Sequence, residues 1–168
     1  MLALGIVTAG ILSRVIIHAP NFTPVITLAL FSGVYLKKKT ALVTPVILMV
    51  LSDIIIGAHN TMLFTWGSVA LIALIGLGIK GRKSFSMILG ASVASAFLFF
   101  IVTNIGAWLT LYPRTGEGLV TCFVAAIPFF SNSLLSTLGY SLLIFGGYEV
   151  FAAQARKVRW AGRLLAEA

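Results

Sequence analysis

Two charged residues, Arg14 and Asp53, stand inside strongly apolar stretches of the sequence and could do chemistry together. Asp53 lies in ALVTPVILMVLSDIIIGAHN, residues 41–60, and Arg14 lies in the first apolar stretch. An aspartate at the centre of a membrane helix costs about 2.5 to 3.5 kcal/mol, so it usually faces a bundle interior and has a partner. Each charge precedes an expected helix end by four positions, which is roughly 6 Å of helix rise. If both ends share one side of a bundle, the two charges are level and can pair.

A matched pair neutralises both charges, so we interpret Arg14 and Asp53 first as a structural clasp and second as a proton relay. The 2 histidines, His18 and His59, have no acidic or cysteine neighbours and make a poor metal site. The single cysteine, Cys122, is interpreted as a small apolar filler. No phosphate-binding loop, HExxH pattern or GxSxG elbow is present. We therefore expect no metal, no cofactor and no catalytic centre, and a membrane enzyme that uses Asp53 or His59 is the weakest hypothesis.

The composition indicates that lipid is the natural solvent of this chain. Hydrophobic residues make up 60% of the 168 residues, charged residues make up 10%, and the mean hydropathy is +1.08. The length predicts one domain. The net charge of +8 does not indicate nucleic-acid binding, because the positive residues gather in short connections and in the C-terminal tail.

The hydrophobic segments predict an all-α membrane protein, a bundle of six transmembrane helices. The expected helices cover residues 2–17, 24–36, 41–57, 62–79, 85–109 and 131–151. The second helix is short for a span and starts at Pro24. Residues 119–130, which contain Pro128, are expected to form an additional interfacial helix before the last span. Residues 1–153 then form the membrane domain, and residues 154–168 form a basic cytoplasmic tail.

The basic residues predict the orientation of the bundle. All but Arg14 and Arg114 of the 12 lysines and arginines fall at positions 37–39, 80–83 and 156–163, which share one side if there are six spans. By the positive-inside rule this side is cytoplasmic, so both termini are predicted to be cytoplasmic. The outer side carries HAPNFT, AHNT and LYPRTGEG. Arg14 and Asp53 are then level near the outer side.

Most of the chemically versatile side chains gather near the outer helix ends, which predicts a pocket open to the outside with aromatic walls and a few polar anchors. A buried asparagine there needs a hydrogen-bond partner, from the protein or from a ligand. Tryptophan and tyrosine at helix ends are also typical of aromatic belts, so Trp108 and Tyr112 carry that second interpretation. The outer set comprises Arg14, His18, Asn21, Thr23, Asp53, His59, Asn60, Trp66, Asn104, Trp108, Tyr112, Arg114, Glu117, Cys122 and Asn132.

A stripe of small residues marks the first helix. Gly5, Ala9 and Ser13 recur every four residues, so they share one helical face. Small residues in such a stripe let another helix approach closely. The stripe therefore predicts either packing inside the bundle or docking of a partner.

The order of these parts resembles the substrate-binding S-components of energy-coupling factor (ECF) vitamin transporters. NFTPVITLALFSGVYLKKKTALVTPVILMVLSDIIIG is similar to their proline-started short second helix, basic turn and third helix. More closely, HAPNFTP, LSDIIIGAH, FFIVTNIGAWL, LYPRTGEGL and AAIPFFSNSLL together resemble an uncharacterised, S-component-like family of small bacterial membrane proteins. The resemblance covers nearly the whole chain before the tail.

This resemblance implies a protein of the bacterial inner membrane that binds a small micronutrient in an outward-facing pocket. It implies that Gly5, Ala9 and Ser13 dock a transmembrane coupling subunit with ATPases. The usual docking pattern is alanine-xxx-alanine, which only Ala9 matches, so a solitary transporter is the alternative. The substrate-binding residues that the resemblance implies are His59, Asn60, Trp66, Asn104, Trp108, Arg114 and Asn132.

Two hypotheses of function follow. The first is a membrane-embedded substrate-binding component of an uptake transporter, without enzymatic activity, whose ATP chemistry belongs to partner subunits. The second is a non-transporting scaffold or assembly protein whose outer polar groups only hold the helices together. A tightly bound organic molecule would favour the first hypothesis. A dry, fully packed outer half would favour the second.

Overall fold

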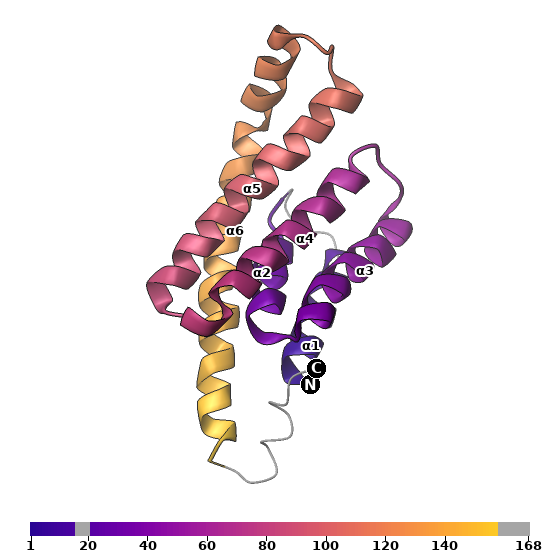
Figure 1. Ribbon diagram of the computed structural model, residues 1–168. Coiled ribbons are helices and arrows are strands. Elements are labelled where there is room, and N and C mark those ends of the chain that lie inside the picture. The colour runs from indigo at the N-terminus through magenta and orange to yellow at the C-terminus, as the bar shows by residue number, and fades with distance from the viewer. Residues whose placement is uncertain (16–20, 158–168) are drawn as a thin grey trace.

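The computed structural model describes residues 1–15 and 21–157, and all regular structure in these ranges is helical (Figure 1). The predicted all-α class is therefore confirmed. His18 and most of the predicted tail, residues 158–168, lie outside the described ranges. Along the chain the elements are α1 (Leu2–Leu12), the 3₁₀ turn η1 (Ser13–Val15), α2 (Val25–Tyr35), α3 (Lys38–Ile56), α4 (Met62–Ile79), the 3₁₀ turn η2 (Lys80–Arg82), α5 (Phe85–Leu111) and α6 (Gly116–Ala155).

Four helices, α3 to α6, are long and apolar enough to cross a membrane, which is the pattern of a multi-pass membrane protein. The helices α1 and α2 are shorter. At about 1.5 Å per residue, the 11 residues of α2 cover about 16 Å, roughly half of the hydrocarbon core of a bilayer. The structure therefore supports four candidate spans, and six complete spans are not confirmed.

The short helix α2 is the centre of the bundle. Every residue from Val25 to Tyr35 is buried, and α2 contacts each of the other α-helices described. Its sequence, VITLALFSGVY, contains no charged residue, so other helices can surround it on all sides. Its closest approach is to α4, where Gly33 and Gly76 bring the two backbones together.

Buried hydroxyl groups join α2 to the hairpin of α5 and α6. Thr27 Oγ1 donates to the Thr137 carbonyl oxygen over 3.0 Å, and it lies 3.3 Å from Ser141 Oγ. The hydroxyls of Ser92 and Ser141 lie 2.8 Å apart and link α5 to α6. Interhelical hydrogen bonds of this kind contribute to helix association where the surroundings are apolar.

The expectation of a separate interfacial helix over residues 119–130 is wrong, because this segment is part of the continuous 40-residue helix α6. Pro128 removes one backbone hydrogen bond but does not end the helix. Aromatic contacts hold both sides of the proline against α5: Phe100 packs on Phe123 and on Phe130, with ring centroids 5.5 and 4.7 Å apart. These contacts pack the parts of α6 before and after Pro128 against the same residue of α5.

The two ends of the bundle differ in charge. Lys80 Nζ donates to the Leu36 carbonyl oxygen over 2.9 Å, and Lys83 Nζ lies 3.1 Å from Glu149 Oε1. These contacts bring the α2–α3 turn, the α4–α5 turn and the last turns of α6 to one end, here called the lysine end. The opposite end, here called the loop end, carries the α3–α4 connection and the α5–α6 turn (Figure 1).

Candidate functional site

Arg14 and Asp53 form an ion pair near the loop end. Arg14 Nη1 lies 2.8 Å from Asp53 Oδ1, and the Asp53 side chain is only 1% exposed. The second carboxylate oxygen, Oδ2, accepts a 2.7 Å hydrogen bond from the indole nitrogen of Trp66. Helices α3 and α4 and the turn η1 therefore meet at one buried carboxylate. We call Arg14, Ser52, Asp53 and Trp66 the Asp53 cluster.

The Arg14 guanidinium has further contacts beside Asp53. Arg14 Nη1 also donates to Ser52 Oγ over 2.7 Å and lies 3.3 Å from the sulfur of Met49. Both oxygens of the aspartate are thus occupied by groups of the protein, as a buried charge requires. This arrangement is that of a structural clasp that holds three elements together.

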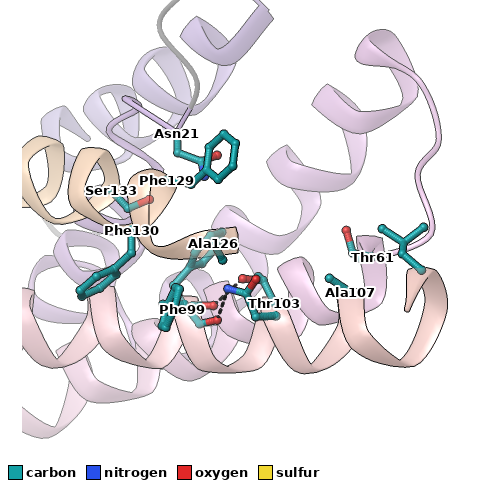
Figure 2. A pocket seen from close by; sticks show the side chains of 12 residues that line it. Asn21, Thr61, Phe99, Thr103, Ala107, Ala126, Phe129, Phe130 and Ser133 are labelled. Atoms are coloured by element: carbon teal, nitrogen blue, oxygen red, sulfur yellow. Dashed lines mark hydrogen bonds between the residues drawn. The ribbon is translucent and has the colours of Figure 1, made fainter. Parts of the chain in front are cut away.

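A cavity of about 240 Å³ lies at the loop end of the bundle, and no residue of the Asp53 cluster lines it. Four phenylalanines of α5 and α6 supply the aromatic part of its wall, and Thr61 and Asn21 border it from the α3–α4 connection and the segment before α2 (Figure 2). The described lining residues are Asn21, Thr61, Phe99, Phe100, Thr103, Asn104, Ala107, Leu111, Ala126, Phe129, Phe130 and Ser133.

The short length of α2 explains where the cavity lies. Because α2 begins only at Val25 and covers about half of a membrane, none of its residues lines the cavity. Ser136 Oγ reaches the Asn21 carbonyl oxygen over 3.4 Å, which ties the start of this turn to α6. Asn21 has a φ of 58°, a conformation that asparagine tolerates better than most residues. The cavity is the space that remains beyond this turn.

The cavity lining is aromatic and polar but carries no ionisable side chain among the described residues. Thr103 Oγ1 donates to Phe99 O and Asn104 Nδ2 donates to Phe100 O, both over 2.7 Å. These bonds use donors within α5, while a threonine oxygen and an amide oxygen can still accept hydrogen bonds. The arrangement can therefore stack a ring and hold one or two donor groups of an uncharged molecule.

The structure does not gather the predicted substrate-binding residues at one site. Of these, Asn104 lines the cavity, whereas Trp66 bonds to Asp53. Trp108 and Arg114 donate to backbone oxygens of the α5–α6 turn region, Pro113 O and Leu109 O. Asn132 is half-buried and outside the cavity lining, and His59 and Asn60 are exposed in the α3–α4 connection.

Sequence reasoning missed the aromatic wall of the cavity. Two Phe–Phe pairs, at 99–100 on α5 and 129–130 on α6, supply it. In the sequence these phenylalanines resemble ordinary residues of a membrane helix. Only the spacing of the first pair from nearby polar residues could have indicated a binding site. Phe100 and Asn104 are one helical turn apart, as are Phe99 and Thr103, so each pair presents a ring and a polar group on one face.

The small-residue stripe lies on the outside of the bundle. Gly5 and Ala9 are exposed, and a Cβ atom added to Gly5 would meet no atom within 4 Å. The opposite face of α1, with Ala3, Val7 and Ile11, is the buried one. Ser13 Oγ donates to the Gly10 carbonyl oxygen within α1. The stripe therefore does not pack inside the bundle.

No group of three or more histidine, cysteine, aspartate or glutamate residues that could hold a metal ion is found within the described ranges. Comparison with curated proteins and with solved structures finds no match to this chain. One family model does match, over residues 1–159, which is nearly the whole chain. The chain therefore belongs to the DUF6580 family, a family of unknown function.

Proposed function

We propose that this protein is a membrane-embedded binding protein for a small, uncharged, ring-bearing molecule, and that it serves as the substrate-binding component of an uptake transporter. The observation that carries the proposal is the aromatic cavity at the loop end, about 240 Å³ in volume. A cavity with aromatic walls and few polar groups is typical of a small-molecule site. The absence of ionisable groups from its described lining favours a neutral ligand, because a charged one would be desolvated without a partner.

Transport requires a way to close the cavity and to open it elsewhere. In the proposed cycle the ligand enters from the loop end, and the α3–α4 connection at Thr61 and the turn at Asn21 close over it. The Asp53 cluster holds α3, α4 and η1 together, so in this cycle the α5–α6 hairpin moves relative to them, together with α2, to which its buried hydroxyls are bonded. An S-component-like arrangement would place the driving ATPase on partner subunits. The exposed stripe at Gly5 and Ala9 is the surface we propose for that contact.

Filling the cavity should abolish ligand retention. We expect Ala126→Phe to reduce the amount of co-purified small molecule at least tenfold, because its side chain enters a cavity of this limited volume. The matched control is Ala125→Phe, since Ala125 is exposed on the same helix and outside the lining. The measurement is mass spectrometry of small molecules extracted from the purified proteins. Equal retention by the two variants, or no small molecule in the unmodified protein, would contradict the proposal.

The proposed uptake direction requires the loop end to face outward, with both termini in the cytoplasm. In cells carrying a single cysteine, a membrane-impermeant maleimide should label Thr115→Cys directly. It should label Lys38→Cys and Lys83→Cys only after the membrane is permeabilised, because excess positive charge marks the cytoplasmic side. The native Cys122 is buried and is replaced by alanine as background. The reverse labelling pattern would rule out uptake through the loop end.

A scaffold function is the second candidate, and the Asp53 cluster favours it. Several outer polar groups bond within the protein: Trp66 to Asp53, Trp108 to Pro113 and Arg114 to Leu109. A scaffold needs no cavity, so Ala126→Phe and Ala125→Phe would then retain the same amount of small molecule. The retention experiment therefore separates the two functions.

A further inference from the structure

A second hollow lies at the lysine end, between the first turns of α5 and the last turns of α6. It is a groove of about 380 Å³ with an apolar interior and a charged rim. Ile88 and Phe145 line its interior, Gly146 leaves space where a side chain would stand, and Ser141 borders its deep end. The rim carries Lys83 and Glu149. This groove is separate from the aromatic cavity at the loop end.

The groove runs along the helices and opens toward the surroundings of the bundle. From Glu149 to Ser141 it follows eight residues of α6, which is about 12 Å. Leu142 in its lining is 51% exposed, and the neighbouring Leu143 is 70% exposed. In a membrane this face contacts acyl chains that lie parallel to the groove. An empty groove would lose dispersion contacts along its walls, which favours its occupation by a chain of the adjoining leaflet.

The rim determines which lipid is favoured, because moving a chain from the bilayer into an apolar groove gives little hydrophobic gain. Lys83 Nζ lies 3.1 Å from Glu149 Oε1 and 4.3 Å from the centre of the Tyr35 ring. An ammonium group has three N–H donors, so it can also bind a phosphate. The Tyr35 hydroxyl also donates to Glu149 Oε1, so Tyr35 and Lys83 share one carboxylate oxygen.

The two rim charges match a headgroup that itself carries both signs. Side chains of Lys83 and Glu149 are 36% and 44% exposed, so both are within reach of a headgroup. A phosphate would bind the lysine, and a primary ammonium would donate to Glu149 Oε2. A headgroup that is only anionic would bring its charge beside the glutamate. A quaternary ammonium has no N–H to donate. We propose that the groove holds one acyl chain of a phospholipid with a primary-amine headgroup, such as phosphatidylethanolamine.

The test is competitive lipid retention by the full-length protein. The purified protein is exchanged into micelles that contain equal amounts of phosphatidylethanolamine, phosphatidylcholine and phosphatidylglycerol with identical chains, and bound lipid is read by native mass spectrometry. We expect phosphatidylethanolamine to be retained about tenfold over phosphatidylcholine, which is the size expected of one charge-assisted hydrogen bond. Glu149→Gln should remove this preference, because the amide is neutral and its oxygen can still accept from Tyr35.

A paired substitution tests the groove itself. Gly146→Leu should lower retention of all three lipids at least tenfold, because Gly146 lines the groove. Gly147→Leu is the matched control, since both glycines have open space at Cβ but only Gly146 lines the groove. Equal retention of the three headgroups, or an unchanged preference in Glu149→Gln, would overturn the assignment. Preference for phosphatidylglycerol would show binding of phosphate alone. A dimer that Gly146→Leu disperses would assign the groove to a second copy of the chain.

Discussion

Replacing Arg14 by methionine is expected to lower the free energy of unfolding by about 3 to 5 kcal/mol, the cost of leaving a buried charge without its partner. Asp53 is 1% exposed, so water cannot replace the guanidinium that lies 2.8 Å from its carboxylate. The Trp66 indole remains as a donor to Oδ2, but one neutral donor does not compensate a full charge. Unfolding of the purified protein in mixed detergent micelles, followed by circular dichroism, measures the loss.

The double variant Arg14→Met/Asp53→Asn should recover most of this loss, because it removes both charges and leaves an amide oxygen for Trp66. The exposed pair of Lys83 and Glu149 supplies a comparison within the same chain. Lys83→Met should cost less than about 1 kcal/mol, since solvent screens a pair at the surface. If the double variant were as unstable as Arg14→Met alone, the two residues would not be energetic partners.

The pairing of Arg14 with Asp53 could be predicted because the rule behind it is local and strong: a charge among apolar residues needs a partner. The role of Trp66 could not be predicted in the same way. A tryptophan near a helix end is compatible with a membrane interface, a ligand wall or a hydrogen bond. Only the packing of α4 against α3 places its indole nitrogen 2.7 Å from Asp53 Oδ2.

The cavity was only partly predictable. A polar outer end and aromatic walls were expected, but the phenylalanines that supply the walls were not distinguishable from lipid-facing residues. Their role depends on α2 beginning only at Val25, so that these parts of α5 and α6 line a cavity and do not pack against α2. The continuity of α6 was missed for a related reason. A proline lowers helix preference locally, whereas the contacts of Phe123 and Phe130 with Phe100 that support the helix are tertiary.

The central position of α2 makes its contact with α4 the most sensitive packing site in the chain. A Cβ atom added to Gly76 would lie 2.9 Å from Gly33 Cα and closer still to the Leu30 carbonyl oxygen. One added to Gly33 would lie 2.7 Å from Gly76 Cα. These neighbours are backbone atoms, so neither helix can relieve the clash by changing a rotamer. Since α2 is buried on all sides, a shift of α2 would disturb its packing against every other helix.

Gly76→Ala is therefore expected to lower the free energy of unfolding by about 3 kcal/mol or more, at or above the upper end of ordinary overpacking. Gly78→Ala is the matched control, because Gly78 lies on the same helix with no atom within 4 Å of an added Cβ. That control should be neutral or stabilising by up to about 1 kcal/mol, since alanine favours a helix over glycine. Both variants are measured by the same unfolding titration in mixed micelles. A small loss for Gly76→Ala, similar to that of Gly78→Ala, would mean that α2 and α4 do not pack backbone to backbone.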